Sequence, residues 1–218
     1  MPFLLFVLLT AGQGRFGDTS QFWLYLAKTI LGVWMLALMW RHVGEMRWAW
    51  SWEAVVVGVA VFVAWVGLDG HYPSAEALVR ALGLSNASGA ASSPDWNPHA
   101  HFSQGGLAWF FIAVRFVGSV LVVPPLEEAF YRSFVYRYLA KVDFQSVSLG
   151  QFLIGPLLIT SAVFGFAHVE WLPGILCGLA YQGLVIRKNR LGDAMTAHAI
   201  TNLLVGAWVV WKGVWHFW

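Results

Sequence analysis

Charged residues are scarce in this chain: Asp, Glu, Lys and Arg make up 11% of its 218 residues, whereas hydrophobic residues make up 59%. The mean hydropathy is +0.64. Because soluble domains carry roughly 25% charged residues, this composition excludes an ordinary soluble domain. The scarcity of charge instead predicts an integral membrane protein whose helices cross the bilayer repeatedly.

Cysteine and net charge are also low. The single cysteine, Cys177, excludes an intrachain disulfide and a metal site built from several thiolates. We interpret it as a small packed side chain and assign it no role. A net charge of +2 is too small to predict nucleic-acid binding, and the sequence contains no nucleic-acid motif.

What the sequence does contain is a series of apolar runs, many of them near the length that a helix needs to cross a bilayer. They predict one all-α polytopic membrane domain over residues 1–218, with about eight transmembrane or membrane-embedded helices in one bundle. The expected helices cover residues 2–12, 22–40, 53–68, 106–123, 125–141, 147–168, 172–187 and 193–211. Residues 69–105, rich in Ser, Gly, Ala and Pro, are expected to form an extramembrane loop with one short helix after Ser74.

The stretch PPLEEAFYRSF places charge in this apolar background. Since backbone polar groups in hydrocarbon must be bonded internally, Pro124-Pro125 is predicted to end one helix and to begin the next. Glu127 and Glu128 would then lie in a first helical turn, where the helix dipole favours carboxylates. Glu128 and Arg132 are four residues apart and can pair on one helix face, which leaves Glu127 unpaired.

Two further polar pairs lie in otherwise apolar runs. Phe164 and His168 are four residues apart, as are His198 and Asn202, so each pair is expected to project from one helix face. Polar side chains inside a membrane face the bundle interior and mark functional sites. At a rise of about 1.5 Å per residue, the two histidines can share one layer of the bundle, and Glu127 can join them.

A free carboxylate beside one histidine, facing a second histidine and an amide, forms a hydrolytic constellation. Glu127 could deprotonate a water molecule that His168 also holds. His198 and Asn202 could donate hydrogen bonds to the oxygen of a tetrahedral intermediate. This arrangement predicts hydrolysis without a covalent enzyme intermediate.

The motifs EEAFYR, FGFAH and HAITN, in this order, resemble the E-E-x-x-x-R, F-x-x-x-H and H-x-x-x-N motifs of the CPBP intramembrane proteases, also called the Abi or type II CAAX prenyl endopeptidase family. The resemblance covers about residues 106–205, which we take as the protease-like core. It implies an eight-helix membrane bundle that cleaves peptide bonds as a glutamic protease, and we expect no cofactor or metal. The implied catalytic residues are Glu127, His168, His198 and Asn202, with Glu128, Arg132 and Phe164 as supporting residues.

The surrounding sequence further resembles a CAAX protease-related subgroup found in bacteria with exosortase protein-sorting systems. The expected partners are therefore a membrane-anchored protein or peptide substrate and the lipid bilayer, with a functional link to an exosortase system as a further hypothesis. Whether prenylated proteins are substrates stays open, as do the cleavage site and the oligomeric state.

Three alternatives compete with a glutamic protease. Glu127, His168 and His198 could bind zinc as a His₂Glu set, although the sequence lacks the H-E-x-x-H pairing. A non-enzymatic scaffold, or an immunity partner of a protein-sorting system, would use the polar layer only to hold helices together. A transporter would show repeat symmetry and paired broken helices, and only the Pro124-Pro125 break is predicted.

The basic residues predict an orientation. On an alternating helical path, one side holds Arg15, Lys28, Arg80, Arg137, Lys141, Arg187, Lys188 and Arg190, and the other holds Arg41, Arg47 and Lys212. The positive-inside rule makes the first side cytoplasmic. We therefore expect a multi-pass protein of a bacterial inner membrane, with Glu127, His168 and His198 toward the periplasmic half.

Arg115 is a cation inside the apolar run that precedes the two prolines. Asp69, Glu170 and a substrate carboxylate are the candidate partners for its guanidinium, and snorkelling to the interface is the alternative. The sequence alone does not choose among them.

Overall fold

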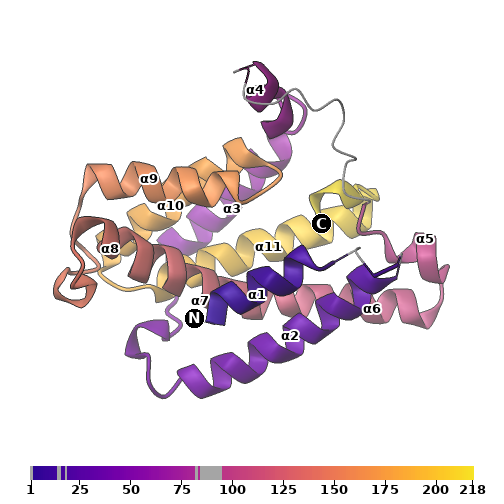
Figure 1. Cartoon of the computed structure of the whole chain (residues 1–218), viewed down its shortest axis with the longest axis horizontal. Helices are drawn as coiled ribbons and strands as arrows, with labels where there is room; N and C mark the ends of the chain where they lie inside the picture. The colour runs from indigo at the N-terminus through magenta and orange to yellow at the C-terminus, as the bar shows by residue number, and fades with distance from the viewer. Residues whose placement is uncertain (1, 14–15, 18, 82, 84–94) are drawn as a thin grey trace.

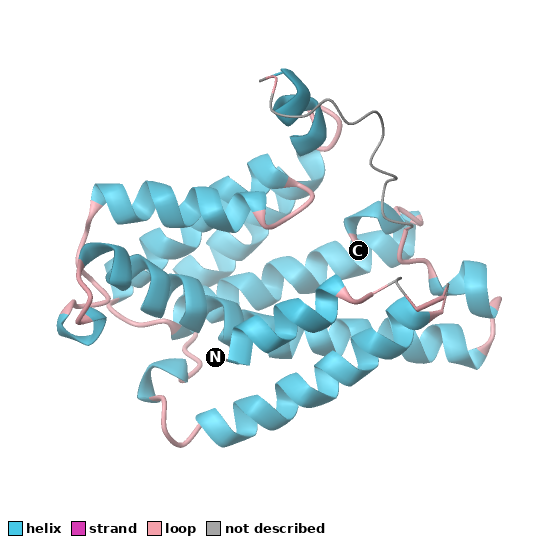
Figure 2. Cartoon of the chain, viewed as in Figure 1, coloured by secondary structure: helices cyan, strands magenta, loops and turns pink. Residues whose placement is uncertain are grey.

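The structure is a computed structural model that describes residues 2–13, 16–17, 19–81, 83 and 95–218. These residues form helices and loops, with no strand among them (Figure 2), which confirms the predicted all-α membrane bundle. The helices labelled in Figure 1 are α1 (Pro2–Ala11), α2 (Ser20–Met39), α3 (Trp52–Gly67), α4 (Ala75–Ala81), α5 (Pro98–Phe102), α6 (Gly106–Val117), α7 (Val123–Glu128), α8 (Tyr136–Ala140), α9 (Ile154–Phe166), α10 (Trp171–Lys188) and α11 (Gly192–Lys212).

Among the described residues, three helices are long and apolar enough to cross a membrane: α2, the continuous helix Gly106–Ala140, and α11. Two shorter apolar helices, α3 and α9, accompany them. Local signals set the helix ends. The Ser51 hydroxyl accepts the Ala54 N–H at the start of α3, and α10 ends at Asn189 in a left-handed conformation with a φ of 51°.

The predicted helix break at Pro124-Pro125 is wrong. Gly106–Ala140 forms one helix of 35 residues, in which π-helical turns at Gly118–Val122 and Ala129–Val135 join α6, α7 and α8. In an α-helix each proline ring would clash with the carbonyl four residues back. A π turn is wider, so the helix continues through both prolines.

The hydrogen bonding before the prolines shows how the π turn works. The Val123 N–H donates to the Gly118 carbonyl, five residues back, directly before Pro124. Because the helix does not restart at the prolines, Glu127 and Glu128 lie in the middle of a helix and not in its first turn. The helix-dipole argument for these two carboxylates therefore fails.

The loops gather at two ends of the bundle, which we call the α8 end and the α5 end (Figure 1). The α8 end comprises residues 40–51, 140–153 and 189–191. An ion pair between Arg137 and Glu45, with 3.0 Å between Nη2 and Oε2, connects the first of these loops to α8. A hydrogen bond of 2.7 Å from the Gly150 N–H to Asn189 Oδ1 connects the second loop to the third.

The α5 end comprises residues 68–74, 95–105, 167–170 and 213–218. The Tyr72 hydroxyl donates to the Glu170 carboxylate, and His216 Nε2 lies 3.2 Å from Asp69 Oδ2. Burial and the neighbouring Glu170 carboxylate raise the pKa of Tyr72. The α5 end is therefore held together by contacts between loops that are far apart in sequence.

The continuous helix also changes the predicted sides of the basic residues. Without a break at the prolines the chain makes one reversal fewer, so the residues before it move to the opposite side. Arg41 and Arg47 consequently lie at the α8 end, where the Arg47 carbonyl packs against Gly192. Lys28, predicted on one membrane side, is instead buried within the bundle. The described basic residues at the α8 end are Arg41, Arg47, Arg137, Lys141, Arg187, Lys188 and Arg190.

Close approaches of helix backbones build the core. A methyl group on Gly178 of α10 would lie 2.8 Å from the Ser161 Cα of α9, and one on Gly58 of α3 would lie 2.7 Å from the Ala197 carbonyl oxygen of α11. Cβ atoms do not come this close, so glycine is what permits both contacts. These two pairs of helices form the wall that carries His198.

Helix α1 is short and lies beside α2 in front of the helix Gly106–Ala140 (Figure 1). Lys28 Nζ donates a hydrogen bond of 2.9 Å to Thr10 Oγ1 and thereby connects α2 to α1. Val7 and Thr10 line the large cavity of the bundle. The first helix thus covers one side of this cavity.

Candidate active site

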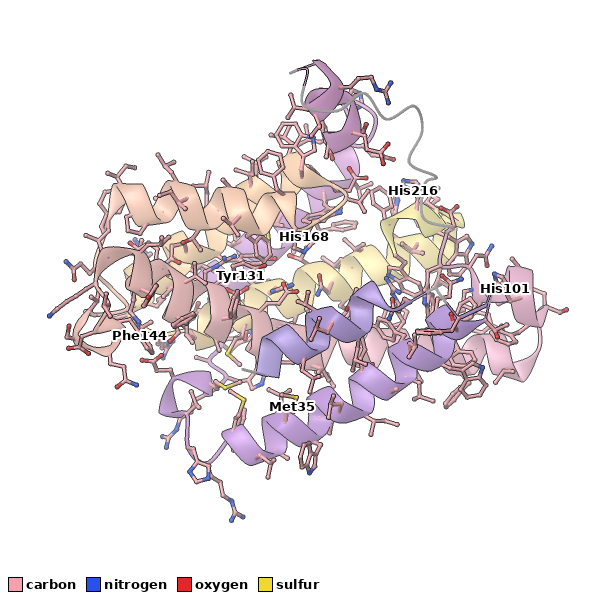
Figure 3. All side chains as sticks on the ribbon, viewed as in Figure 1. Met35, His101, Tyr131, Phe144, His168 and His216 are labelled. Carbon is pink, nitrogen blue, oxygen red and sulfur yellow. The ribbon has the colours of Figure 1, made fainter. Side chains whose placement is uncertain are left out.

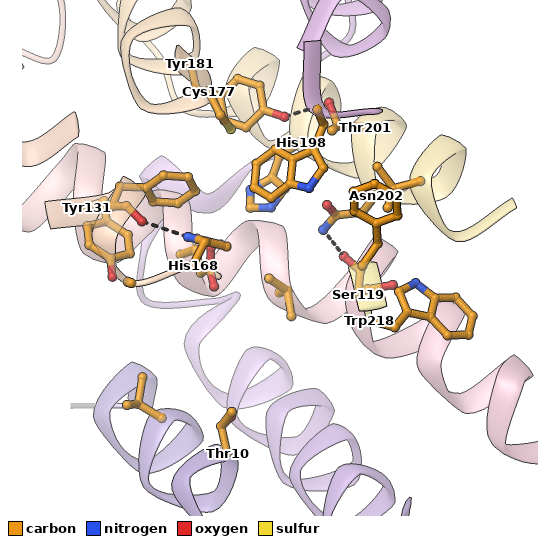
Figure 4. A pocket seen from close by; sticks show the side chains of 18 of the residues that line it. Thr10, Ser119, Tyr131, His168, Cys177, Tyr181, His198, Thr201, Asn202 and Trp218 are labelled. Atoms are coloured by element: carbon orange, nitrogen blue, oxygen red, sulfur yellow. Dashed lines mark hydrogen bonds between the residues drawn. The ribbon is translucent and has the colours of Figure 1, made fainter. Parts of the chain in front are cut away.

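A cavity of about 690 Å³ lies between the helices, and all the residues predicted as catalytic line it (Figure 4). These are Glu127 from α7, His168 from the turn after α9, and His198 and Asn202 from α11. Phe164 lines it as well. Figure 3 labels His168 at the turn that joins α9 to α10. The three sequence motifs therefore converge on one space.

Glu127 presents a carboxylate with unused hydrogen-bonding capacity. Its Oε2 atom is buried and has no hydrogen-bond partner among the described residues. Tyr131, one turn further along the helix, also lines the cavity. A buried carboxylate oxygen without a donor is costly unless a ligand or water supplies one. Glu127 Oε2 is therefore available to accept a hydrogen bond from a molecule in the cavity.

Glu128 occupies the opposite environment and has two partners. Its side chain is fully buried, with Oε2 3.2 Å from Arg132 Nε and Oε1 2.9 Å from His198 Nδ1. The expected pair with Arg132 is present. The bond to His198 was not predicted, because it joins residues 70 positions apart and leaves no signal in local spacing.

Arg132 depends on Glu128 for its charge compensation. It is fully buried, and its guanidinium carbon lies 4.5 Å from the centroid of the Phe164 ring. Among the described residues its three nitrogens have no hydrogen-bond acceptor. The ion pair with Glu128 and the Phe164 ring face are thus the contacts that stabilise this buried cation. Neither Glu128 nor Arg132 lines the cavity.

The bond to Glu128 fixes the tautomer and orientation of His198. A carboxylate accepts, so Nδ1 carries a hydrogen, and Nε2 is left for the cavity. The residue is only 4% exposed, and its ring lies 5.3 Å from the Tyr181 ring. In the imidazolium form of the ring, Nε2 is a donor as well.

The predicted helix over residues 147–168 includes His168, but in the structure His168 lies in the turn after α9. Its Nδ1 donates to the Phe164 carbonyl at 2.7 Å, the bond drawn beside it in Figure 4. In the neutral ring, Nε2 is then an unprotonated acceptor. The Trp65 ring meets the imidazole edge-on at 5.7 Å. The turn that holds His168 is anchored by Trp171 Nε1, which donates to the Pro73 carbonyl at 2.9 Å.

Asn202 is oriented by the Ser119 carbonyl, which has no N–H donor within the helix because Pro124 lacks one. Its Nδ2 donates to the Ser119 carbonyl at 2.7 Å. In the π turn that carbonyl would bond to residue 124, but Pro124 has no N–H. The Val123 N–H is already bonded to Gly118. The second hydrogen on Asn202 Nδ2 is therefore available to a ligand in the cavity.

The donor set does not fit the zinc alternative. The described residues contain no group of three His, Cys, Asp or Glu side chains arranged to hold a metal ion. We derive no step through a metal ion at this site.

Arg115 lines the same cavity but pairs with neither of its predicted acidic partners. Asp69 contacts His216, and Glu170 accepts from Tyr72. The Arg115 guanidinium instead lies among aromatic rings at the α5 end of the cavity. Cys177, to which the sequence assigned no role, also lines the cavity and is 2% exposed.

Comparison with known proteins supports the motif assignment. Residues 107–204 match the family model described as Type II CAAX prenyl endopeptidase Rce1-like. No curated protein and no solved structure matches the chain. The family match confirms the resemblance expected from the three motifs, and it does not address the link to exosortase systems.

Proposed function

Because residues 107–204 belong to the Rce1-like type II CAAX prenyl endopeptidase family, we propose that this membrane protein is an intramembrane glutamic endopeptidase that cleaves a membrane-anchored polypeptide. The family match supports a membrane endopeptidase acting on a peptide. The glutamate mechanism rests on one observation, which concerns the only carboxylate among the described residues that line the cavity. This carboxylate, Glu127, has an oxygen without a hydrogen-bond donor. His168, His198 and Asn202 line the same cavity.

In the proposed first step, Glu127 and His168 activate a water molecule. The water donates one hydrogen to the Glu127 carboxylate and the other to Nε2 of His168. Glu127 takes the proton as the water oxygen forms its bond to the substrate carbonyl carbon. The carbonyl π electrons move to oxygen and give a tetrahedral oxyanion.

In the second step, His198 and Asn202 stabilise that oxyanion. Nε2–H of protonated His198 and the second hydrogen of Asn202 Nδ2 donate to it. Glu128 accepts from Nδ1–H of His198 and so holds the ring in this orientation. The oxyanion then collapses, the C–N bond breaks, and the proton on Glu127 passes to the leaving amine. Glu127 returns to its starting state, with no covalent enzyme intermediate.

Glu127→Gln tests this function in cells. Membrane proteomes of cells that express the wild type or the variant are compared for one protein whose N- or C-terminus shifts. We expect the shift with wild type only, since the amide cannot take the proton. Glu76→Gln, on an exposed position of α4, is the matched control and should behave as wild type. Unchanged processing by Glu127→Gln at normal abundance would contradict the proposal.

We further propose that the protein is a multi-pass protein of a bacterial inner membrane, with the α8 end in the cytoplasm. The corrected helical path supports this, because most described basic residues outside the cavity and core lie at that end. His99 serves as the reporter position at the opposite end. In a Cys177→Ala background, a cysteine at His99 should react with an impermeant maleimide in spheroplasts, and one at Arg187 only after permeabilisation. The reverse pattern would overturn the orientation.

A further inference from the structure

A second hollow of the molecule lies between α3 and α10, and we call it the α3–α10 groove. Its volume is about 430 Å³, and its apolar lining includes Val56 of α3 and Gly183 and Leu184 of α10. These residues differ from those that line the active-site cavity. Val56 is 65% exposed, so the groove opens outward from the bundle. In a membrane protein, an apolar surface of this kind faces lipid.

Gly183 gives the groove its depth. A methyl group added there would meet no atom of the described residues within 4 Å, whereas one on Gly178 of the same helix would lie 2.8 Å from the Ser161 Cα. The lining residues of α10 extend from Ala180 to Arg187, which is roughly 10 Å along the helix. One leaflet contributes roughly 15 Å to the hydrocarbon core of a bilayer. The groove therefore has the length to hold most of one acyl chain.

The charged lining residues, Glu53 and Arg187, lie together at the α8 end of the groove. Lys188 Nζ lies 2.7 Å from Glu53 Oε1, and Arg187 Nε lies 3.7 Å from the same oxygen. A separation of 3.7 Å is too long for a hydrogen bond, and the Arg187 side chain is 71% exposed. Lys188 thus compensates the Glu53 carboxylate. The Arg187 guanidinium keeps its donors for an anion outside the chain.

Two tryptophans place this end of the groove at the membrane surface. Trp52 lines the groove, and its ring meets the Trp50 ring edge-on at 5.2 Å. Both side chains are exposed, and exposed tryptophans of membrane proteins gather at the level of the lipid headgroups. The seven described basic residues of the α8 end outnumber its described carboxylates, which are Glu45, Glu53, Asp143 and Asp193. This surplus of positive charge attracts anionic headgroups.

We propose that the α3–α10 groove binds an anionic phospholipid, with one acyl chain along Gly183 and Leu184 and the headgroup phosphate at Arg187. A zwitterionic headgroup would bring its own cation beside Arg187 and Lys188, whereas an anionic headgroup such as glycerol phosphate does not. The lipid would lie against the helix that also carries Tyr181, a lining residue of the active-site cavity. It would thus support the cavity wall from outside the bundle. The proposal does not depend on the protease function.

Native mass spectrometry tests this site by resolving single bound lipids. Full-length protein in a maltoside detergent is titrated with dioleoyl phosphatidylglycerol or dioleoyl phosphatidylcholine, and the dissociation constant of the first bound lipid is measured. We expect phosphatidylglycerol to bind at least tenfold more tightly. Arg187→Gln should abolish this preference, and Arg187→Lys should retain part of it, because an ammonium keeps the charge without the planar fork of donors. Gly183→Leu should weaken the binding of both lipids at least tenfold, since its side chain fills the groove.

Two matched controls should bind both lipids as the wild type does. Lys212→Gln removes a cation that lies 4.0 Å from the Trp211 ring, at the opposite end of the bundle. Gly155→Leu adds the same side chain at a glycine of α9 that also has no described atom within 4 Å of an added methyl group.

Each other outcome is decisive. Equal affinity for the two lipids, or a preference that survives Arg187→Gln, would overturn the headgroup contact, and the exposure of Arg187 lets this variant keep the fold. Full lipid binding by Gly183→Leu at an unchanged melting temperature would overturn the groove as the site. Oleic acid that binds as tightly as phosphatidylglycerol, with the same dependence on Gly183, would overturn the phospholipid and assign a fatty-acyl site.

Discussion

The cavity wall at Glu127 and the core around Glu128 begin one residue apart on the same helix. On the wall, Glu127 lines the cavity, and its Oε2 atom has no hydrogen-bond donor among the described residues. In the core, formed by Glu128, Arg132 and the Nδ1 edge of His198, the neighbouring carboxylate is fully buried and has a partner on each oxygen. A rotation of about 100° per residue separates the two environments. Identical side chains thus acquire different environments: one carboxylate has an oxygen without a donor beside the cavity, and the other has a partner on each oxygen.

Glu127→Gln should have the largest effect and should lower activity without lowering stability. The rate should fall by about 10⁴-fold, which is about 5.5 kcal/mol in activation free energy, because the amide cannot accept the water proton. Stability should not fall, since no hydrogen bond to Oε2 is lost. Single-turnover cleavage measures the rate, and thermal unfolding measures the stability, both in phosphatidylcholine nanodiscs. A variant that keeps more than a few per cent of the rate would remove Glu127 from the role of general base.

Glu128→Gln should mainly affect the core. The variant leaves the buried guanidinium of Arg132 without its counter-charge, and the free energy of unfolding should fall by about 3–5 kcal/mol. The rate should also fall, because the amide oxygen is a weaker acceptor than the carboxylate for the Nδ1–H of His198 and orients the ring less firmly. Chemical denaturation in mixed micelles measures the first effect, and single-turnover kinetics on the folded fraction measures the second.

The double variant Glu128→Leu, Arg132→Met sharpens this test. Replacing a buried ion pair by apolar residues of similar volume is often neutral or stabilising. Stability should therefore return toward wild type, whereas activity should stay low because His198 has lost its Nδ1 acceptor. Recovery of both properties would show that Glu128 acts on activity only through folding.

Local spacing was sufficient to predict which residues meet at the site. The i,i+4 pairs and the rise per residue predicted that Glu127, His168, His198 and Asn202 lie in one layer, and the structure brings all four to one cavity. Their catalytic roles stay predictions. The fold class followed from composition, because a chain this apolar has few alternatives to a helical bundle.

Longer-range features were beyond the sequence rules. The proline rule failed at Pro124 because it treats an α-helix as the alternative to a break, and a π turn is a third solution. That error added one chain reversal and misplaced Arg41 and Arg47. The bond between Glu128 and His198 joins two helices, and no periodicity within either helix encodes it.

Asn202→Ala tests the wall without touching the core. It removes one donor to the oxyanion, and the rate should fall by about 10²- to 10³-fold with little change in substrate affinity. Pro124→Ala is the companion variant, because it restores an N–H that can compete for the Ser119 carbonyl and free Asn202. It should lower the rate by less. An unchanged rate in Asn202→Ala would leave His198 as the sole oxyanion donor.

The smallest effect is expected from Gly178→Ala, which weakens the packing of α10 against α9 without changing a polar group. The new methyl group would lie 2.8 Å from the Ser161 Cα, so α9 and α10 must separate slightly, at a cost of about 1–3 kcal/mol. Gly183→Ala, on the same helix with no atom within 4 Å of the added methyl group, should instead be neutral or stabilising by up to about 1 kcal/mol. Thermal unfolding compares the two variants, and the rate of the folded fraction should match wild type in both. If fully folded Gly178→Ala protein lost activity, a shift of α10 would affect both the core and the cavity wall. The effects of Glu127 and Glu128 would then be less separable than their contacts indicate.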